Sequence, residues 1–182
     1  MTNINEKLIV AGFGGQGVML LGQLLSYAAT EEAYNTVWIP SYGPETRGGT
    51  ANCSVIISSD EINSPVVSLC DTLIALNEPS LKKFESKVKP GGIIITNSGL
   101  IKDYEYRTDV SVYAIDASQM ALDIGNLKTI NMVTLGAYIG VKKIFTSDQI
   151  TAIFNKIFTG GKAKLIEVNK KALKVGMDAV KA

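Results

Sequence analysis

The stretch KLIVAGFGGQGV, residues 7–18, decides how this sequence can fold. An apolar run over 7–11 leads into a glycine-rich turn over 12–17, and an apolar segment typical of a helix follows over 18–33. This order predicts the first strand, turn and helix of a doubly wound α/β domain. In such a unit the glycines allow a tight turn, and backbone amides at the helix N-terminus can bind an anion.

The glycine turn leaves two interpretations open. Its amides can surround a phosphate of a nucleotide or of a phosphorylated cofactor. Glycines at a strand–helix junction also allow close packing without any ligand. Because the motif alone does not decide between them, the following residues carry more weight. The candidate binding residues of the turn are Gly12, Gly14, Gly15, Gln16 and Gly17.

The second predicted strand, 36–39, ends in the sequence PSYG. A dinucleotide-binding domain carries an acidic residue at this strand tip, about 20 residues after the turn, which binds the ribose hydroxyls. No Asp or Glu stands at the tip here. The sequence therefore argues against a stand-alone nicotinamide-dependent oxidoreductase.

The loop SYGPETRGG, residues 41–49, holds an opposite-charge pair among glycines. If this loop packs beside the glycine turn, Arg47 can bind a phosphate or carboxylate through two hydrogen bonds while Glu45 orients its guanidinium. The alternative is a solvated pair on a turn. The glycines around a single arginine favour the binding interpretation. The candidate residues of this loop are Tyr42, Glu45, Arg47, Gly48 and Gly49.

Length and composition limit the class of protein. The 182 residues predict a single domain, 1–182, with 46% hydrophobic and 19% charged residues and a net charge of +1. This balance indicates neither a nucleic-acid surface nor a membrane partner. The N-terminus lacks the basic and apolar blocks of a signal peptide, and Gly22 and Gln23 interrupt the longest apolar stretch. We therefore expect a cytoplasmic protein.

The reactive residue types are few. The sequence has no histidine, which removes Ser-His and Cys-His nucleophiles and histidine metal sites. Its two cysteines, Cys53 and Cys70, are too few for an iron–sulfur cluster or a cysteine-rich zinc site. Cys53 falls on the apolar side of a predicted strand in which apolar and polar residues alternate, which favours a thiol buried in the core. We expect no catalytic and no metal-binding residue in this chain.

The remaining chain alternates between strand and helix patterns. It predicts an α/β fold, a single Rossmann-like three-layer domain with a mainly parallel sheet and C-terminal helices that cover the sheet. Asn77 and Asn97 follow buried strands and are secondary candidates for the ligand crevice, although loop asparagines commonly satisfy their own backbone. Asp116 is expected to cap a helix. The further strands are expected over 50–58, 72–76, 93–96 and 110–115, and the helices over 80–88, 128–143, 147–158 and 164–181.

Three motif regions, 12–18, 40–55 and 77–98, together resemble the gamma subunit of 2-oxoacid:ferredoxin oxidoreductases, the pyruvate/ketoisovalerate oxidoreductase gamma-domain family. The resemblance runs from Lys7 to the last helix. The sequence motifs SYGPE and RGGTAN are most similar to those of the 2-oxoglutarate type of this family. Two alternatives stay open: the small subunit of an indolepyruvate oxidoreductase, and a purely structural or nucleotide-binding Rossmann-like subunit.

The resemblance implies a complex that decarboxylates a 2-oxoacid on thiamine diphosphate and forms an acyl-CoA. Electrons pass through iron–sulfur clusters to ferredoxin. Alpha and beta subunits hold the thiamine diphosphate and its magnesium, and a ferredoxin-like delta subunit joins them. This chain alone is expected to hold no cofactor and to be inactive. We expect the glycine turn and the loop from Tyr42 to Gly49 to shape the approach of CoA and the contact between subunits.

Overall fold

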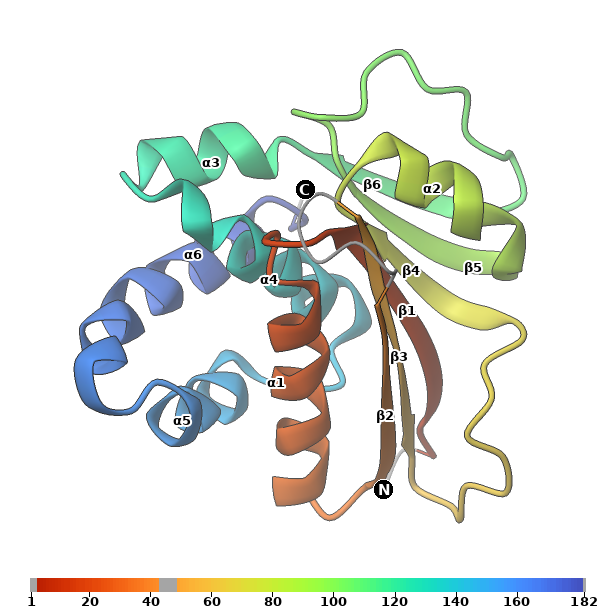
Figure 1. The fold of residues 1–182 in the computed structure, drawn as a ribbon. Helices are drawn as coiled ribbons and strands as arrows, with labels where there is room; N and C mark the ends of the chain where they lie inside the picture. The colour runs from red at the N-terminus through yellow and green to blue at the C-terminus, as the bar shows by residue number, and fades with distance from the viewer. Residues whose placement is uncertain (1–2, 43–48, 182) are drawn as a thin grey trace.

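The computed structural model describes residues 3–42 and 49–181. Within these ranges, six strands form one sheet in the order β2-β3-β1-β4-β5-β6 (Figure 1). All neighbouring strands run parallel except β3, which is antiparallel to both β1 and β2. The strands are β1 (Asn5–Phe13), β2 (Asn35–Tyr42), β3 (Thr50–Ser58), β4 (Cys70–Ala75), β5 (Val88–Asn97) and β6 (Ser111–Ile115).

The helices lie on both faces of this sheet (Figure 1). Helices α1 and α4 pack against one face over a core that includes Leu8 and Val10. Helix α2 packs against the other face over Ile9 and Ala11. The α-helices are α1 (Val18–Glu31), α2 (Glu78–Phe84), α3 (Ala117–Asp123), α4 (Ile130–Lys142), α5 (Ser147–Ile157) and α6 (Ile166–Asp178), and the short 3₁₀ helices are η1 (Glu85–Lys87), η2 (Leu127–Thr129) and η3 (Gly160–Leu165).

The predicted fold class, an α/β fold with a mainly parallel sheet, is confirmed. The position of β3 was not foreseen, since it lies between β1 and β2 and separates two strands that a doubly wound domain usually places side by side. Its register pairs Phe13 with Thr50, so the end of β1 meets the beginning of β3. This pairing brings Gly49 next to the glycine turn.

Local signals at helix ends are confirmed. Thr146 and Gln149 form the capping box at the start of α5, each side chain bonding to the other residue's backbone amide. The side chain of Asp116 caps α3 by accepting a hydrogen bond from the amide of Gln119. Asn77 caps α2 in the same way through the amide of Ser80.

The expectation that the last helix covers the sheet is wrong. Helix α6 packs on α4, which itself lies on the sheet, so α6 forms an outer layer (Figure 1). The reason is a pair of glycines that bring the two helices into backbone contact. A methyl group on Gly136 would lie 2.0 Å from the carbonyl oxygen of Leu173, and one on Gly176 would lie 1.9 Å from that of Val133.

No helix among the described residues is long and apolar enough to cross a membrane.

Candidate functional site

The glycine turn connects β1 to α1 at the carboxyl end of the sheet, where ligands of open α/β sheets bind. Gly15 and Gly17 have φ angles of 94° and 77°, a conformation that glycine adopts without strain. Gly12 has no room for a side chain, because a methyl group there would lie 2.7 Å from Gln16 Oε1 and 2.9 Å from Val18 Cγ2. The backbone conformation or the lack of space therefore explains why glycine occupies each of these three positions.

Gln16 holds the turn in place. Its Oε1 accepts a hydrogen bond of 2.7 Å from the amide of Phe13 and one of 2.9 Å from Asn77 Nδ2. Asn77 follows β4, the parallel neighbour of β1, so this contact joins two adjacent strand ends. Gln16 and Asn77 thus lie side by side at these strand ends, and their side chains are engaged with each other and with backbone.

Asn131 is a neighbour of the turn that sequence reasoning missed. Its Nδ2 donates a hydrogen bond of 3.3 Å to the carbonyl oxygen of Gly17, and the two residues are 114 positions apart. A methyl group on Gly17 would lie 2.2 Å from Asn131 Nδ2. Because asparagine at the start of a helix is common as a cap, no local signal could have revealed this contact.

The second candidate loop does meet the first turn. The amide of Gly14 donates a hydrogen bond of 3.0 Å to the carbonyl oxygen of Gly49. Tyr42 is the last residue of β2 and pairs with Ala51 of β3. The other candidates of this loop, Glu45, Arg47 and Gly48, lie outside the described residues. Their role in binding stays a prediction.

Two backbone amides of the turn have no partner among the described residues. The amides of Gly15 and Gly17 make no hydrogen bond with another described residue. Helix α1 begins without a side-chain cap and without an acidic residue in its first turn. Such a helix start carries partial positive charge and free donors, which favours a phosphate or carboxylate ligand.

Asn97, the other asparagine candidate, is the last residue of β5, and its side chain is fully engaged in hydrogen bonds. Its Oδ1 accepts hydrogen bonds from the amides of Gly99 and Ser118, both at 3.2 Å. Its Nδ2 donates to Ser118 Oγ at 2.8 Å. These bonds favour the alternative reading of Asn97 as a turn residue.

A buried polar cluster lies at the opposite end of the sheet, where β1 begins. Glu6 is 3% exposed, accepts a hydrogen bond of 2.6 Å from Thr72 Oγ1 and forms an ion pair of 2.7 Å with Lys142. Burial raises the pKa of Glu6, although Lys142 and Thr72 act in the other direction. Burial also raises the pKa of Tyr138, and the nearby charge of Glu6 adds to this. The cluster ties α4 to the sheet, far from the glycine turn.

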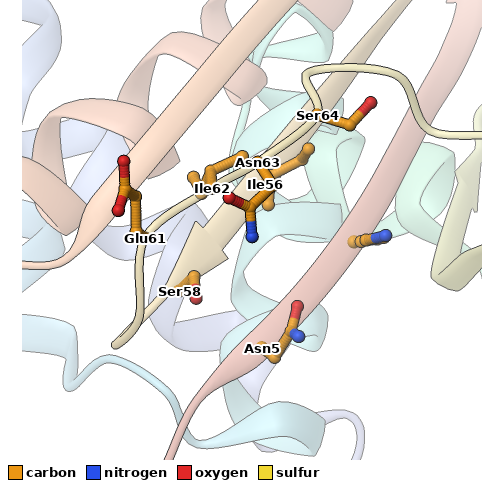
Figure 2. Close-up of a pocket in the computed structure, with 8 residues that line it drawn as sticks. Asn5, Ile56, Ser58, Glu61, Ile62, Asn63 and Ser64 are labelled. Carbon is orange, nitrogen blue, oxygen red and sulfur yellow. The ribbon is translucent and has the colours of Figure 1, made fainter.

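A pocket of about 220 Å³ lies near that same end of the sheet. Figure 2 shows the segment from Glu61 to Ser64 passing over the end of β3 and the beginning of β1. Lys7 and Glu61 supply opposite charges to its lining. Because the pocket is at the amino end of β1, it does not belong to the crevice expected at the carboxyl ends of the strands.

Both cysteines are buried, which confirms the prediction of a core thiol at Cys53. Burial raises the pKa of Cys53 to about 11 and that of Cys70 to about 12, so neither is an activated nucleophile. Among the residues that the structure describes, no group of three or more His, Cys, Asp or Glu side chains is placed to hold a metal ion.

Comparisons with known proteins point to one family. The sequence profile described as pyruvate ferredoxin/flavodoxin oxidoreductase matches residues 7–179. Ketoisovalerate oxidoreductase subunit VorA of Methanothermobacter marburgensis is 35% identical over 172 residues, covering 94% of this chain and 36% of VorA. 2-Oxoglutarate synthase subunit KorC of Methanocaldococcus jannaschii is 30% identical over 182 residues, covering 96% of each chain. The chain thus spans about a third of the VorA protein and nearly all of KorC.

A solved structure agrees with these relatives. The gamma subunit of a keto/oxoacid ferredoxin oxidoreductase from Geobacter sulfurreducens is 26% identical and superposes with a TM-score of 0.81. The match covers 96% of this chain and 98% of that subunit. The fold described above is therefore shared over essentially the whole length of both chains.

Proposed function

The chain belongs to the pyruvate ferredoxin/flavodoxin oxidoreductase family, and we propose that it is the gamma-type subunit of a multi-subunit 2-oxoacid:ferredoxin oxidoreductase. The observation that carries this proposal is the end-to-end match of sequence and fold to subunits of such enzymes. Alpha, beta and ferredoxin-like delta subunits are the proposed partners, and ferredoxin is the proposed electron acceptor. The complex converts a 2-oxoacid and CoA into an acyl-CoA and carbon dioxide.

The cofactors of this reaction fit partner subunits better than they fit this chain. An iron–sulfur cluster of the common type needs four thiolates, and the chain has only Cys53 and Cys70, both buried. The described residues also offer no acidic cluster for a magnesium ion of thiamine diphosphate. We therefore place thiamine diphosphate, magnesium and the clusters on the other subunits, and assign no step of the chemistry to this chain.

The proposed contribution of this chain is to guide CoA. The amides of Gly15 and Gly17, together with the start of α1, supply donors for an anionic group. The bond from Gly14 to Gly49 holds the second loop beside them, and Arg47 stands two residues before Gly49 in the sequence. An arginine at that place can bind a phosphate oxygen pair and retain the coenzyme. The same loop is proposed to contact a neighbouring subunit.

The 2-oxoacid itself has two candidates. The amino-acid sequence of residues 41–52 resembles the 2-oxoglutarate type and favours 2-oxoglutarate as the substrate. The relative KorC, which matches this chain over nearly its whole length, is a subunit of a 2-oxoglutarate synthase and supports the same substrate. The higher identity to VorA favours ketoisovalerate, a branched-chain acid. Activity assays with both acids discriminate between them.

The test begins with the tagged chain, purified without oxygen from its native cell. Mass spectrometry of co-purifying chains and dye reduction with CoA and several 2-oxoacids are then measured. Thiamine-binding and ferredoxin-like partners with CoA-dependent dye reduction are the expected result. A lone chain without activity would contradict the proposal.

The role of the loop is tested in the purified complex by Arg47→Ala, with Lys171→Gln on the exposed side of α6 as the charge-matched control. We expect the KM for CoA to rise about ten-fold in Arg47→Ala, as for the loss of one charged hydrogen bond. The KM for the 2-oxoacid should not change. If neither assembly nor the KM for CoA changes, Arg47 has no part in either.

A further inference from the structure

Three exposed leucines surround the short helix α3. Leu100 lies in the loop between β5 and β6, Leu122 lies near the end of α3, and Leu127 lies in η2. Their exposed fractions are 49%, 55% and 55%. Among the described residues only one other leucine is comparably exposed, Leu69 at 50%. The exposed leucines are therefore concentrated around one helix.

Hydrogen bonds fix the loop that carries Leu100 to the start of α3. The side-chain oxygen of Asn97 accepts from the amides of Gly99 and Ser118, which joins the loop to the first turn of the helix. The amide of Leu100 donates a bond of 3.0 Å to the carbonyl oxygen of Asn97. A methyl group on Gly99 would lie 2.4 Å from Asp116 Oδ1, so the loop is also closely packed there. The backbone of Leu100 thus has a defined position beside α3.

A Schellman motif ends α3 between the other two leucines. The amide of Asn126 donates a bond of 3.0 Å to the carbonyl oxygen of Ala121, and the amide of Gly125 donates one of 2.8 Å to that of Leu122. Gly125 has a φ angle of 87°, which reverses the direction of the chain without strain. Leu122 and Leu127 therefore flank one tight turn at the end of α3.

All three leucines belong to the carboxyl edge of the parallel strands. Strands β1, β4, β5 and β6 run parallel, so the segments that follow them leave the sheet at one edge. The glycine turn follows β1, Leu100 follows β5, and α3 follows β6. Figure 1 shows α3 at the same end of the sheet as the turn into α1. Leu69 directly precedes β4 and so lies at the opposite edge.

The chemistry of these side chains suits a protein partner. A leucine offers no hydrogen-bonding group to an ion or a polar ligand, and its removal from water is favourable. Single exposed leucines are common on protein surfaces and need no partner. Here three of them surround a helix of seven residues in an ordered part of the chain. Interfaces of permanent complexes are more apolar than those of transient ones, which matches this composition.

The position of the leucines identifies the partner within the proposed enzyme, and this step rests on the proposed function. No step of the chemistry is assigned to this chain, so CoA guided by the glycine turn has to face the subunit on which the reaction takes place. That catalytic subunit therefore lies against the carboxyl edge, beside the turn. The three leucines lie at this edge, where the approach of the partner would cover them.

The lengths of two relatives support a partner from the same enzyme. The segment similar to this chain makes up 36% of VorA, so nearly two-thirds of that polypeptide lies outside the match. In KorC the match covers 96% of the protein. A continuous polypeptide keeps its parts together at high effective concentration. Where the parts are separate chains, an apolar interface has to replace the covalent link.

We propose that Leu100, Leu122 and Leu127, here called the leucine edge, form the docking surface for the catalytic subunit. Strand β2 runs in the same direction as β1, because β3 is antiparallel to both, and Tyr42 ends it at the same edge of the sheet. The leucine edge thus extends the subunit contact proposed for the loop that begins at Tyr42. Docking buries the leucines and holds the glycine turn against the partner.

The test compares leucines at the two edges of the sheet in the complex purified without oxygen. Leu122→Gln/Leu127→Gln removes apolar surface from the leucine edge, and Val66→Gln/Leu69→Gln does the same for exposed residues before β4. Size-exclusion chromatography of a dilution series gives the apparent Kd of assembly. We expect this Kd to rise about 100-fold for the leucine-edge variant, or about ten-fold per leucine, and less than about two-fold for the control.

Two further measurements separate docking from folding and from CoA binding. Hydrogen exchange over 98–101 and 117–128 should be slower in the complex than in the free chain, whereas exchange over 60–69 should not change. The core strands of each variant should exchange as in the unmodified chain, because the substituted residues are exposed. At concentrations that keep the complex assembled, the KM for CoA should be unaltered by the leucine-edge variant, in contrast to Arg47→Ala.

The proposal is overturned if the control weakens assembly as much as the leucine-edge variant, or if the leucine edge gains no protection in the complex. It is also overturned if the free chain forms a dimer that Leu122→Gln/Leu127→Gln dissociates, because a second copy is then the occupant. An active complex that assembles equally well with every variant rejects the docking surface and leaves the proposed function intact. A chain that recovers no partner rejects both.

Discussion

The glycines of the turn and the glycines between α4 and α6 serve opposite purposes. Gly15 has a φ angle of 94°, and a methyl group added there would meet no atom within 4 Å. Gly176 lies inside a regular helix, yet a methyl group on it would lie 1.9 Å from the backbone of α4. The first needs glycine for its backbone conformation, and the second needs it for the absence of a side chain. Glycine is therefore required for two different physical reasons in the two regions.

The largest effect is expected for Gly176→Ala. The clashing atoms are the carbonyl group of Val133 and the amide nitrogen of Ala137, and backbone cannot move aside as a side chain can. We expect the free energy of unfolding to fall by about 3 kcal/mol or more, measured by chemical denaturation. The control is Gly161→Ala, where a methyl group would meet nothing within 4 Å, with an expected change within about 0.5 kcal/mol. Equal stability of the two variants would contradict the packing role.

Gly17→Ala combines both effects, since Gly17 has a positive φ angle and lies against Asn131. The strain of a left-handed alanine is about 1 to 2 kcal/mol, and the displaced Asn131 adds to it. We expect a total loss of about 2 to 3 kcal/mol in the free energy of unfolding. In an Asn131→Ala background the cost of Gly17→Ala should fall to the strain alone. An unchanged cost in that background would show that contact with Asn131 is irrelevant.

Gln16→Leu tests whether side chains or glycines hold the turn. The substitution removes the oxygen that accepts from Phe13 and Asn77, and leaves two donors without a partner. We expect a loss of about 1 to 2 kcal/mol in the free energy of unfolding, and Gln16→Glu should retain most of the stability because it keeps the acceptor. A Gln16→Glu variant as unstable as Gln16→Leu would argue against these bonds.

Gly15→Ala is expected to have the smallest effect on stability of the four and a separate effect on binding. With no atom nearby, only conformational strain of about 1 kcal/mol is expected. If the amide of Gly15 contacts CoA in the complex, the KM for CoA rises while the KM for the 2-oxoacid stays the same. If the KM for CoA is unchanged in Gly15→Ala, the turn has a structural role and does not contact CoA.

Elements that depend on neighbouring residues were predictable. The strand Thr50–Ser58 was expected with both ends correct, because its alternation of apolar and polar residues is a local pattern. Burial of Cys53 and the capping box of Thr146 follow from the same kind of short-range spacing. Helix ends were less accurate: the expected helix over 80–88 is α2 (Glu78–Phe84) followed by η1, because Pro79 and the Asn77 cap start it earlier.

The candidate site was predictable only in part. The glycine turn and its proximity to the second loop could be expected, because loops at one end of a sheet lie close together. The positions of Asn131 and Asn169 near the glycine turn could not be predicted, because neither residue lies in a recognisable motif. Both are placed there by the packing of α4 and α6. The functional meaning of Arg47 stays a prediction.

The amino-acid sequence by itself determined the α/β class, the turn between β1 and α1, most strands and the family, because these depend on local periodicity and on ordered motifs. Only the tertiary structure decided the insertion of β3 between β1 and β2, the position of α6 on α4, and the contact of Asn131 with the glycine turn. These features depend on contacts between residues far apart in the chain. Such contacts are set by packing and by the satisfaction of buried polar groups in three dimensions, for which sequence spacing carries no direct signal.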